Sequence, residues 1–162
     1  MYQFIRSVVT GLVSGYIGLH IMDPVTTHLY AMESQQDRQR EKQVSPGVAY
    51  DIAARKISNM AGLQLSDEQI SIVASGFHTG LGLGAGVLYV QLRRSIGLDP
   101  FRAALVVFLL LWVGIDEGAN WIFHFSAPPT AYPLATHIRG FLGHAALLAG
   151  AAITAESLEL GE

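Results

Sequence analysis

Residues 103–125 are the part of the chain that most restricts its fold. They form an apolar run, AALVVFLLLWVGIDEGANWIFHF, with two adjacent carboxylates, Asp116 and Glu117, near the middle. As a helix rising about 1.5 Å per residue, the run covers roughly the 30 Å hydrocarbon thickness of a bilayer. Charges at that depth are costly, so acidic residues inside a membrane span are functional candidates by default. The run therefore predicts a transmembrane helix with one polar side.

The composition agrees with a membrane protein. Charged residues make up 14% of the 162 residues, well below the roughly one quarter typical of soluble domains, and the apolar residues are clustered. The net charge of -3 argues against a nucleic-acid partner. The absence of cysteine excludes disulfides, thiolate metal sites, iron–sulfur clusters and covalently attached c-type haem. The length allows one compact bundle, so we expect a single membrane domain over residues 1–162.

Four apolar stretches predict the fold class: an all-α, polytopic membrane protein with four transmembrane helices. No small-residue cleavage site follows the first stretch, so we expect an uncleaved first helix and not a signal peptide. Ser66 to Gln69 reads as a capping box before the second span, and Asp99-Pro100 is a cap-and-proline start before the third. The expected spans are 4–22, 70–92, 103–125 and 135–155.

Residues 24–66 are expected to form a polar and amphipathic helical connection between the first two spans. Asp23-Pro24 should end the first span, because Asp caps a new helix and Pro suits its first position. A polar helix over 25–43 should follow, and Ser45-Pro46-Gly47 should start an amphipathic one that lies on the membrane surface or against the bundle. Its apolar stripe comprises Ala49, Ile52, Ala53, Ile57 and Met60.

Polar residues of the third span are predicted to share one side of the helix. At about 100° per residue, Asn120 falls about 40° from Asp116, His124 about 80° and Glu117 about 100°. Each of the other spans also carries a polar side with histidine: His20 in the first, His78 in the second, and the pair His137 and His144 in the fourth. These sides are expected to face a common interior. Glycines occupy the opposite sides of the first two spans, where they predict close packing within the bundle or against a second copy or partner subunit; they are Gly11, Gly15, Gly18, Gly76, Gly80 and Gly84.

Three functions could use such an interior. The first is proton or cation movement, because carboxylates and histidines are the usual relay groups of pumps and transporters; the candidate pathway is Asp116, Glu117, Asn120, His124, His78 and His20. The second is a metal ion or b-type haem, since helix bundles hold metals with histidine and carboxylate from facing helices; the candidate ligands are His78, Glu117, His124, His137 and His144. The third is an accessory or scaffold subunit whose polar side pairs with another membrane chain.

Each of these residues also has a structural explanation. A single histidine in a bundle is more often packed and hydrogen-bonded than chemical, and Asp116 or Glu117 could serve only as an ion pair, with Arg139 as the cation near enough to the membrane. No nucleophile elbow, phosphate-binding glycine loop or zinc-protease motif is present, so we expect no catalysis.

Three short motifs resemble the YagU-type family of uncharacterised bacterial inner-membrane proteins. They are the glycine-led His78 followed by Tyr89, the stretch from Trp121 to His124 running into Pro128-Pro129, and Phe141-Leu142-Gly143-His144 with Glu156 near the end of the last helix. The resemblance implies about four spans in the bacterial inner membrane, both termini in the cytoplasm, and a link to acid response. It implies no reaction, cofactor or substrate, and the acid pair has no counterpart in it. The arginines of the short connections and span ends likewise favour both termini inside.

Overall fold

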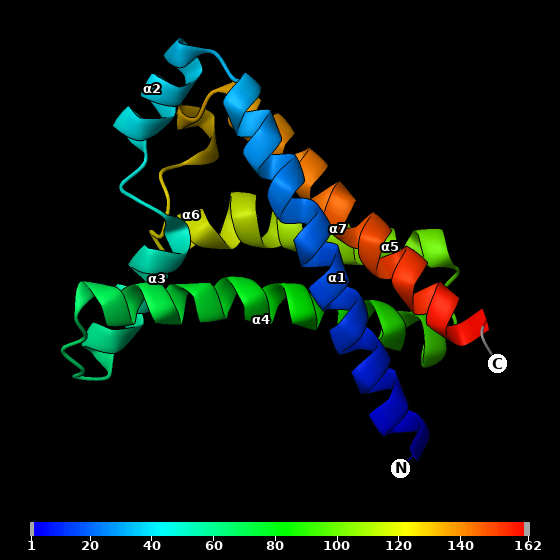
Figure 1. Cartoon of the computed structure of the whole chain (residues 1–162). Helices are drawn as coiled ribbons and strands as arrows, with labels where there is room; N and C mark the ends of the chain where they lie inside the picture. Colours follow the sequence, from blue (N-terminus) through cyan, green and yellow to red (C-terminus); the bar gives the residue numbers. More distant parts are fainter. Residues whose placement is uncertain (1, 161–162) are drawn as a thin grey trace.

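The computed structural model of the chain describes residues 2–160, and all the secondary structure in this range is helical. In Figure 1, α1 packs along α7 and also crosses α4, with the segment from α5 to α6 completing the bundle. The elements in order are α1 (Tyr2–Met32), α2 (Gln35–Val44), α3 (Ala49–Met60), α4 (Asp67–Arg94), α5 (Pro100–Leu109), the π-helix η1 (Leu110–Ala119), α6 (Asn120–Ile122), the 3-10 turn η2 (Pro129–Ala131) and α7 (Leu134–Leu160).

Three of these helices are long and apolar enough to cross a membrane: α1, α4 and the Leu134–Leu158 part of α7. Large apolar side chains point outward along them, such as Phe4 and Val9 of α1, Ile72 of α4 and Ile153 of α7. Extended apolar surface of this kind is typical of a chain in contact with lipid. The all-helical fold class is therefore confirmed. The expected span 103–125 is helical only to Ile122 and is divided among α5, η1 and α6, none of which has the length of a span alone.

The first helix does not end where the sequence predicts. It continues through Pro24 to Met32, so the expectation that a new helix starts at Asp23-Pro24 is wrong. A proline inside a helix removes one backbone hydrogen bond, here the one to the His20 carbonyl oxygen. The Thr26 hydroxyl adds side-chain hydrogen bonds in the same turn, 3.2 Å from the Met22 carbonyl oxygen and 3.1 Å from that of Asp23. Packing against α7 on both sides of Pro24, at Gly18 and at Thr26, supplies the stability that holds this helix together.

The connection between α1 and α4 is helical, as expected, but the buried side of α3 matches the predicted apolar stripe only in part. Small residues, Ala53, Ala54 and Ser58, are buried, whereas Ile57 and Met60 of the predicted apolar stripe are 50% and 88% exposed. Alanine and serine allow α3 to approach α4 closely; a second small core of Ala54, Ile70 and Ala74 forms between them, with Tyr50, Leu65, Val73 and Phe77 packed around it.

Both predicted helix starts are confirmed. The Ser66 hydroxyl accepts a hydrogen bond from the Gln69 backbone N–H, while the Gln69 side chain accepts one from the Ser66 N–H, so the capping box is complete. Asp99 accepts a hydrogen bond from the Arg102 N–H, and Pro100 occupies the first turn of α5. These caps satisfy backbone donors that a helix N-terminus leaves unpaired.

Helices α1 and α4 touch at four glycines. Gly11 and Gly15 of α1 face Gly82 and Gly86 of α4. A Cβ placed on Gly86 would lie 2.2 Å from the Gly11 carbonyl oxygen, and one placed on Gly15 would lie 2.4 Å from the Gly82 carbonyl oxygen. A Cβ in either place would overlap backbone atoms. Paired small residues four positions apart are a common way for membrane helices to approach closely.

The predicted packing glycines therefore divide into two groups. Gly18 joins Gly11 and Gly15 as a close contact, since its Cβ would lie 2.5 Å from the Leu147 carbonyl oxygen of α7. A Cβ on Gly76, Gly80 or Gly84 would meet nothing within 4 Å in the part of the chain that the structure describes. On α4, Gly82 and Gly86 make the close contact within the chain, and the use of the other three by a second copy or partner subunit stays a prediction.

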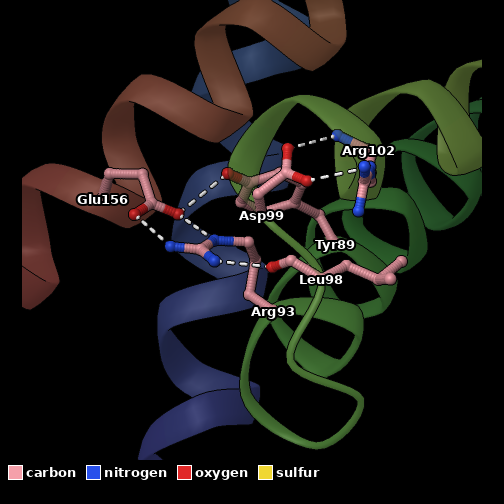
Figure 2. Close-up of polar contacts among 6 residues, drawn as sticks. All are labelled: Tyr89, Arg93, Leu98, Asp99, Arg102 and Glu156. Carbon is pink, nitrogen blue, oxygen red and sulfur yellow. Dashed lines mark hydrogen bonds and ion pairs between the residues drawn. The ribbon is translucent and has the colours of Figure 1, made fainter.

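A half-buried ion-pair network joins the end of α4 to α7 (Figure 2). Arg93 binds both carboxylate oxygens of Glu156, with Nε 2.6 Å from Oε1 and Nη2 2.8 Å from Oε2. The hydroxyl of the fully buried Tyr89 donates to the same carboxylate at 2.9 Å, and Arg93 Nη1 donates to the Leu98 carbonyl at 2.6 Å. The network thus fixes the α4–α5 connection and the end of α7 together. Near it, the Arg94 guanidinium donates to the Ser7 hydroxyl of α1. The start of α1, the end of α7 and this connection accordingly lie at one end of the bundle (Figure 1).

Candidate functional site

Asp116 and Glu117 lie in the π-helix η1 and not in an ordinary α-helix. The i to i+5 hydrogen bonds of a π-helix widen the turn, and such segments occur frequently at functional sites. The prediction of about 100° per residue therefore does not apply to this stretch. Even so, Asp116, Glu117 and Asn120 all line the same cavity. The wider turn leaves the two adjacent acids on the side of the helix that faces α7.

Glu117 pairs with His137 of α7. The His137 Nδ1 lies 2.6 Å from Glu117 Oε1, and its Nε2 lies 3.0 Å from the Pro129 carbonyl oxygen. Because a carbonyl can only accept, the Nε2 must carry a proton. The short Nδ1–Oε1 contact then needs a second proton between histidine and carboxylate. His137 and Glu117 consequently hold one proton in common, either on the imidazole or on the acid.

Asp116 faces the second histidine of α7, two turns further along. The His144 Nδ1 donates to the Gly140 carbonyl oxygen at 2.9 Å and lies 3.7 Å from Asp116 Oδ2. His144 is nearly enclosed, with its side chain 8% exposed, while the Asp116 side chain is 33% exposed. The contact between them is therefore electrostatic at this distance, and the carboxylate remains open to the cavity. Two acid–imidazole pairs thus stand side by side across the η1–α7 interface.

These two pairs line a cavity of about 280 Å³. The wall opposite the pairs comes from α1 and from the loop between α6 and α7, including Thr26, Ser126, Pro129 and Tyr132. The buried hydroxyl oxygen of Thr136, also in the lining, has no hydrogen-bond partner in residues 2–160. Buried hydroxyls of this kind are normally satisfied by water or by a bound ligand. The volume and the lining are those of a water-containing space.

Arg139 lies at one side of the cavity and is held by two acids. Its Nη1 donates to Glu33 at the end of α1, and its Nη2 lies 2.6 Å from Glu41 Oε1 of α2. The Tyr30 ring covers the guanidinium, with Arg139 Cζ 5.0 Å from the ring centroid. This contact attaches α2 to α7. It also means that Arg139 pairs with Glu33 and Glu41, and not with Asp116 or Glu117 as the structural explanation of the acid pair required.

Two predicted pathway histidines do not join the cavity. His124 follows the end of α6 at Ile122, has a positive φ of 56° and is exposed, and its carbonyl oxygen accepts a hydrogen bond from Lys56 at 3.1 Å. The helix ends too early to place it on the predicted polar side. His20 lies on the outside of α1, where its ring contacts Tyr16 at 4.2 Å between centroids. His78 remains near the site, and its Nε2 lies 3.3 Å from Asp23 Oδ1.

The predicted metal ligands are not brought together. Within residues 2–160, no three His, Asp or Glu side chains are arranged so that they could hold one metal ion. His137 and His144 each face a different acid, and His124 is outside the cavity. The donor types suit a metal, but they are arranged in two separate pairs.

Several site residues were not predicted from the sequence. Tyr50 of α3 lies close to Asp116 and His78, and Thr136 and Tyr132 line the main cavity. Tyr50 falls on a helix that the sequence assigns to the connection, so only the long-range packing of α3 on α4 reveals it. Thr136 is one residue before His137, which the sequence did single out, and it carries no separate signal.

No protein-family model matches the chain, and the comparisons with curated proteins and with solved structures found no match either. The site must therefore be interpreted from its own residues.

Proposed function

We propose that this chain is a four-span protein of the bacterial inner membrane whose cavity takes part in proton movement, either as transport or as a response to pH. The observation that carries the proposal is the pairing of Glu117 with His137 and of Asp116 with His144 in one cavity. Histidine exchanges protons near neutral pH, and intramembrane chains of acids and histidines are typical of proton relays. The 2.6 Å contact between His137 and Glu117 already requires a shared proton.

The segment from α5 to α6 serves as the fourth span in this proposal. At the junctions, Leu110 and Asn120 keep right-handed helical backbone angles, so the chain continues without a turn from Pro100 to Ile122. Its outward side chains are apolar, including Leu105, Leu109 and Val113. A helix that lines a proton path in a membrane needs apolar side chains towards the lipid on one side and acidic side chains towards the interior on the other.

The orientation in this proposal rests on the arginines nearest the span ends, since a bare count of Lys and Arg at the two ends of the bundle does not decide it. Arg93, Arg94 and Arg102 lie beside the short 95–99 connection, at the same end as the start of α1 and the end of α7. An excess of Lys and Arg near short loops marks the cytoplasmic side. We therefore place both termini in the cytoplasm, and the cavity lining from Ser126 to Tyr132 towards the opposite side of the membrane.

A metal cation is the weaker candidate for the moving species. A metal site places several ligand atoms around one point, whereas the described acids and histidines of the cavity form two separate pairs.

A role as an accessory subunit of a larger membrane complex is the alternative function, and it involves no transport. It rests on the outward-facing Gly76, Gly80 and Gly84 of α4, where a partner helix could approach closely.

The experiment compares proton flux in proteoliposomes carrying a pH gradient. The native protein should dissipate the gradient, and the double variant Asp116→Asn with Glu117→Gln should reduce the rate by at least about tenfold, because amides cannot carry a proton in this relay. The matched control is Asp67→Asn with Glu68→Gln, the adjacent exposed acids at the start of α4. The control should keep the native rate.

Flux that is absent from the native protein, or unchanged in the cavity variant, contradicts the proposal. Purification of the chain only as a fixed complex with a second membrane protein, together with absent flux, supports the subunit role instead.

A further inference from the structure

A second, much smaller cavity lies on the other side of Asp116. It measures about 20 Å³ and is enclosed mainly by apolar side chains such as Leu111, Ile115 and Leu147. Four polar side chains also reach it: Tyr50 from α3, His78 from α4, Asp116 from η1 and His144 from α7. Asp116 and His144 line the main cavity as well, so the two spaces share one wall.

The size and lining of this space match a single water molecule. A cavity needs roughly 10–15 Å³ of such volume to hold one water, and a buried water needs two to four polar partners. This cavity provides about 20 Å³ and four polar side chains. His78 and His144 already have one protein partner each, Asp23 and the Gly140 carbonyl oxygen, and a water in this space would add a partner for the Asp116 carboxylate and the Tyr50 hydroxyl.

His78 leads from this small cavity to the surface of the bundle. Its Nε2 lies 3.3 Å from Asp23 Oδ1 of α1, and its ring meets the edge of the Tyr50 ring at 5.5 Å between centroids. The exposed fractions of the side chains rise along this line, from 34% for His78 to 58% for Asp23. Asp116, His78 and Asp23 therefore form a series of titratable groups that begins in the main cavity and ends outside it.

Tyr50 completes the lining with a donor. Burial, together with the nearby Asp116 carboxylate, raises the pKa of Tyr50 well above its ordinary value, so the hydroxyl keeps its proton throughout the physiological range. The phenol can therefore donate a hydrogen bond to a water in this cavity or to Asp116. It orients the water without exchanging a proton itself.

We propose that one water molecule in this small cavity connects Asp116 to His78 and extends the proton path of the main cavity to the surface at Asp23. This route rests on the proposed function of the main cavity. Protonated Asp116 gives its proton to the water, and the water gives one of its own to the free nitrogen of His78. His78 then releases the proton on Nε2 to the Asp23 carboxylate. Each step breaks one O–H or N–H bond and forms another, and the water is regenerated.

The test uses His78→Gln in the same proteoliposome assay, with His20→Gln as the matched control. Both residues are histidines of predicted spans, but His20 lies on the outside of α1, away from both cavities. His78→Gln should reduce proton flux by at least about tenfold, because an amide cannot accept a proton on one nitrogen and release one from another. Asp23→Asn should reduce it in the same direction, and His20→Gln should keep the native rate.

A second readout separates a proton route from a structural role. The thermal unfolding midpoint of His78→Gln in detergent should match that of the native protein, because glutamine can still form a hydrogen bond with Asp23. Native flux in His78→Gln overturns this route and leaves the proposed function standing. Loss of flux together with a lowered unfolding midpoint also overturns it, because His78 would then only hold the fold. Absent flux in the native protein overturns both proposals.

Discussion

Gly86→Ala is expected to destabilise the bundle by about 3 kcal/mol, the upper part of the range for overpacking a tight contact. The new methyl group would lie 2.2 Å from the Gly11 carbonyl oxygen and 2.4 Å from the Gly15 backbone nitrogen. These are backbone atoms, so no side-chain rotation can relieve the overlap. Helices α1 and α4 must separate along the whole crossing. The measurement is the free energy of reversible unfolding in mixed detergent micelles.

The matched control is Gly80→Ala, in the same helix and less than two turns away. A Cβ there meets nothing within 4 Å in the described part of the chain. Alanine is favoured over glycine inside a helix by about 0.5–1 kcal/mol, so this variant should be as stable as the native protein or slightly more stable. Equal stability losses in the two variants would show that helix packing at Gly86 is not what limits the fold. A loss in Gly80→Ala alone, in a protein that forms dimers, would indicate instead that a second copy packs on that face.

Glu156→Gln is expected to reduce the free energy of unfolding by about 2 kcal/mol. Hydrogen bonds to charged groups contribute about this much, and the half-buried Arg93 guanidinium would be left without its carboxylate partner. Arg93 would lose its bidentate partner, and Tyr89, which is fully buried, would lose a charged acceptor for its hydroxyl. Thermal unfolding followed by circular dichroism in detergent measures the effect.

Two further variants test whether the stability lost in Glu156→Gln comes from breaking the Arg93–Glu156 ion pair. Arg55→Gln removes an ion pair with Asp67 whose side chains are 51% and 92% exposed, and it should cost less than about 1 kcal/mol. The double variant Arg93→Met with Glu156→Leu should recover part of the stability lost in Glu156→Gln, since a buried apolar pair has no unpaired charge. A Glu156→Gln protein as stable as the Arg55→Gln protein would contradict the network shown in Figure 2.

Local signals in the sequence predicted the starts of helices well. The capping box at Ser66 and the Asp99-Pro100 start are both present, because caps depend only on residues within one turn. The same local reasoning failed at Pro24, where contacts of Gly18 and Thr26 with α7 keep the helix intact. It was right only in part for the buried side of α3, which includes Ala53 of the predicted stripe but also Ala54 and Ser58, small residues that allow close approach to α4.

The candidate site was predicted in part. The sequence singled out Asp116, Glu117, Asn120, His78, His137 and His144, and the structure places them all at the two neighbouring cavities. It could not predict which histidine faces which acid, because that depends on the registration of α7 against η1. It also could not predict that Arg139 binds Glu33 and Glu41, since these acids lie about one hundred residues away along the chain. The roles proposed for these residues stay predictions, as does the resemblance to the YagU-type family.

The π-helix η1 makes the cavity sensitive to chain length as well as to residue type. Deleting one residue from 110–119 would allow the segment to close into an ordinary α-helix, which is locally the more stable form. On that α-helix the adjacent Asp116 and Glu117 would lie about 100° apart, so one of the two acids would leave the side that faces α7 and the cavity. Sequence changes that preserve every cavity residue could thus still separate the acids from their histidines, so in this segment the number of residues is as important as their identity.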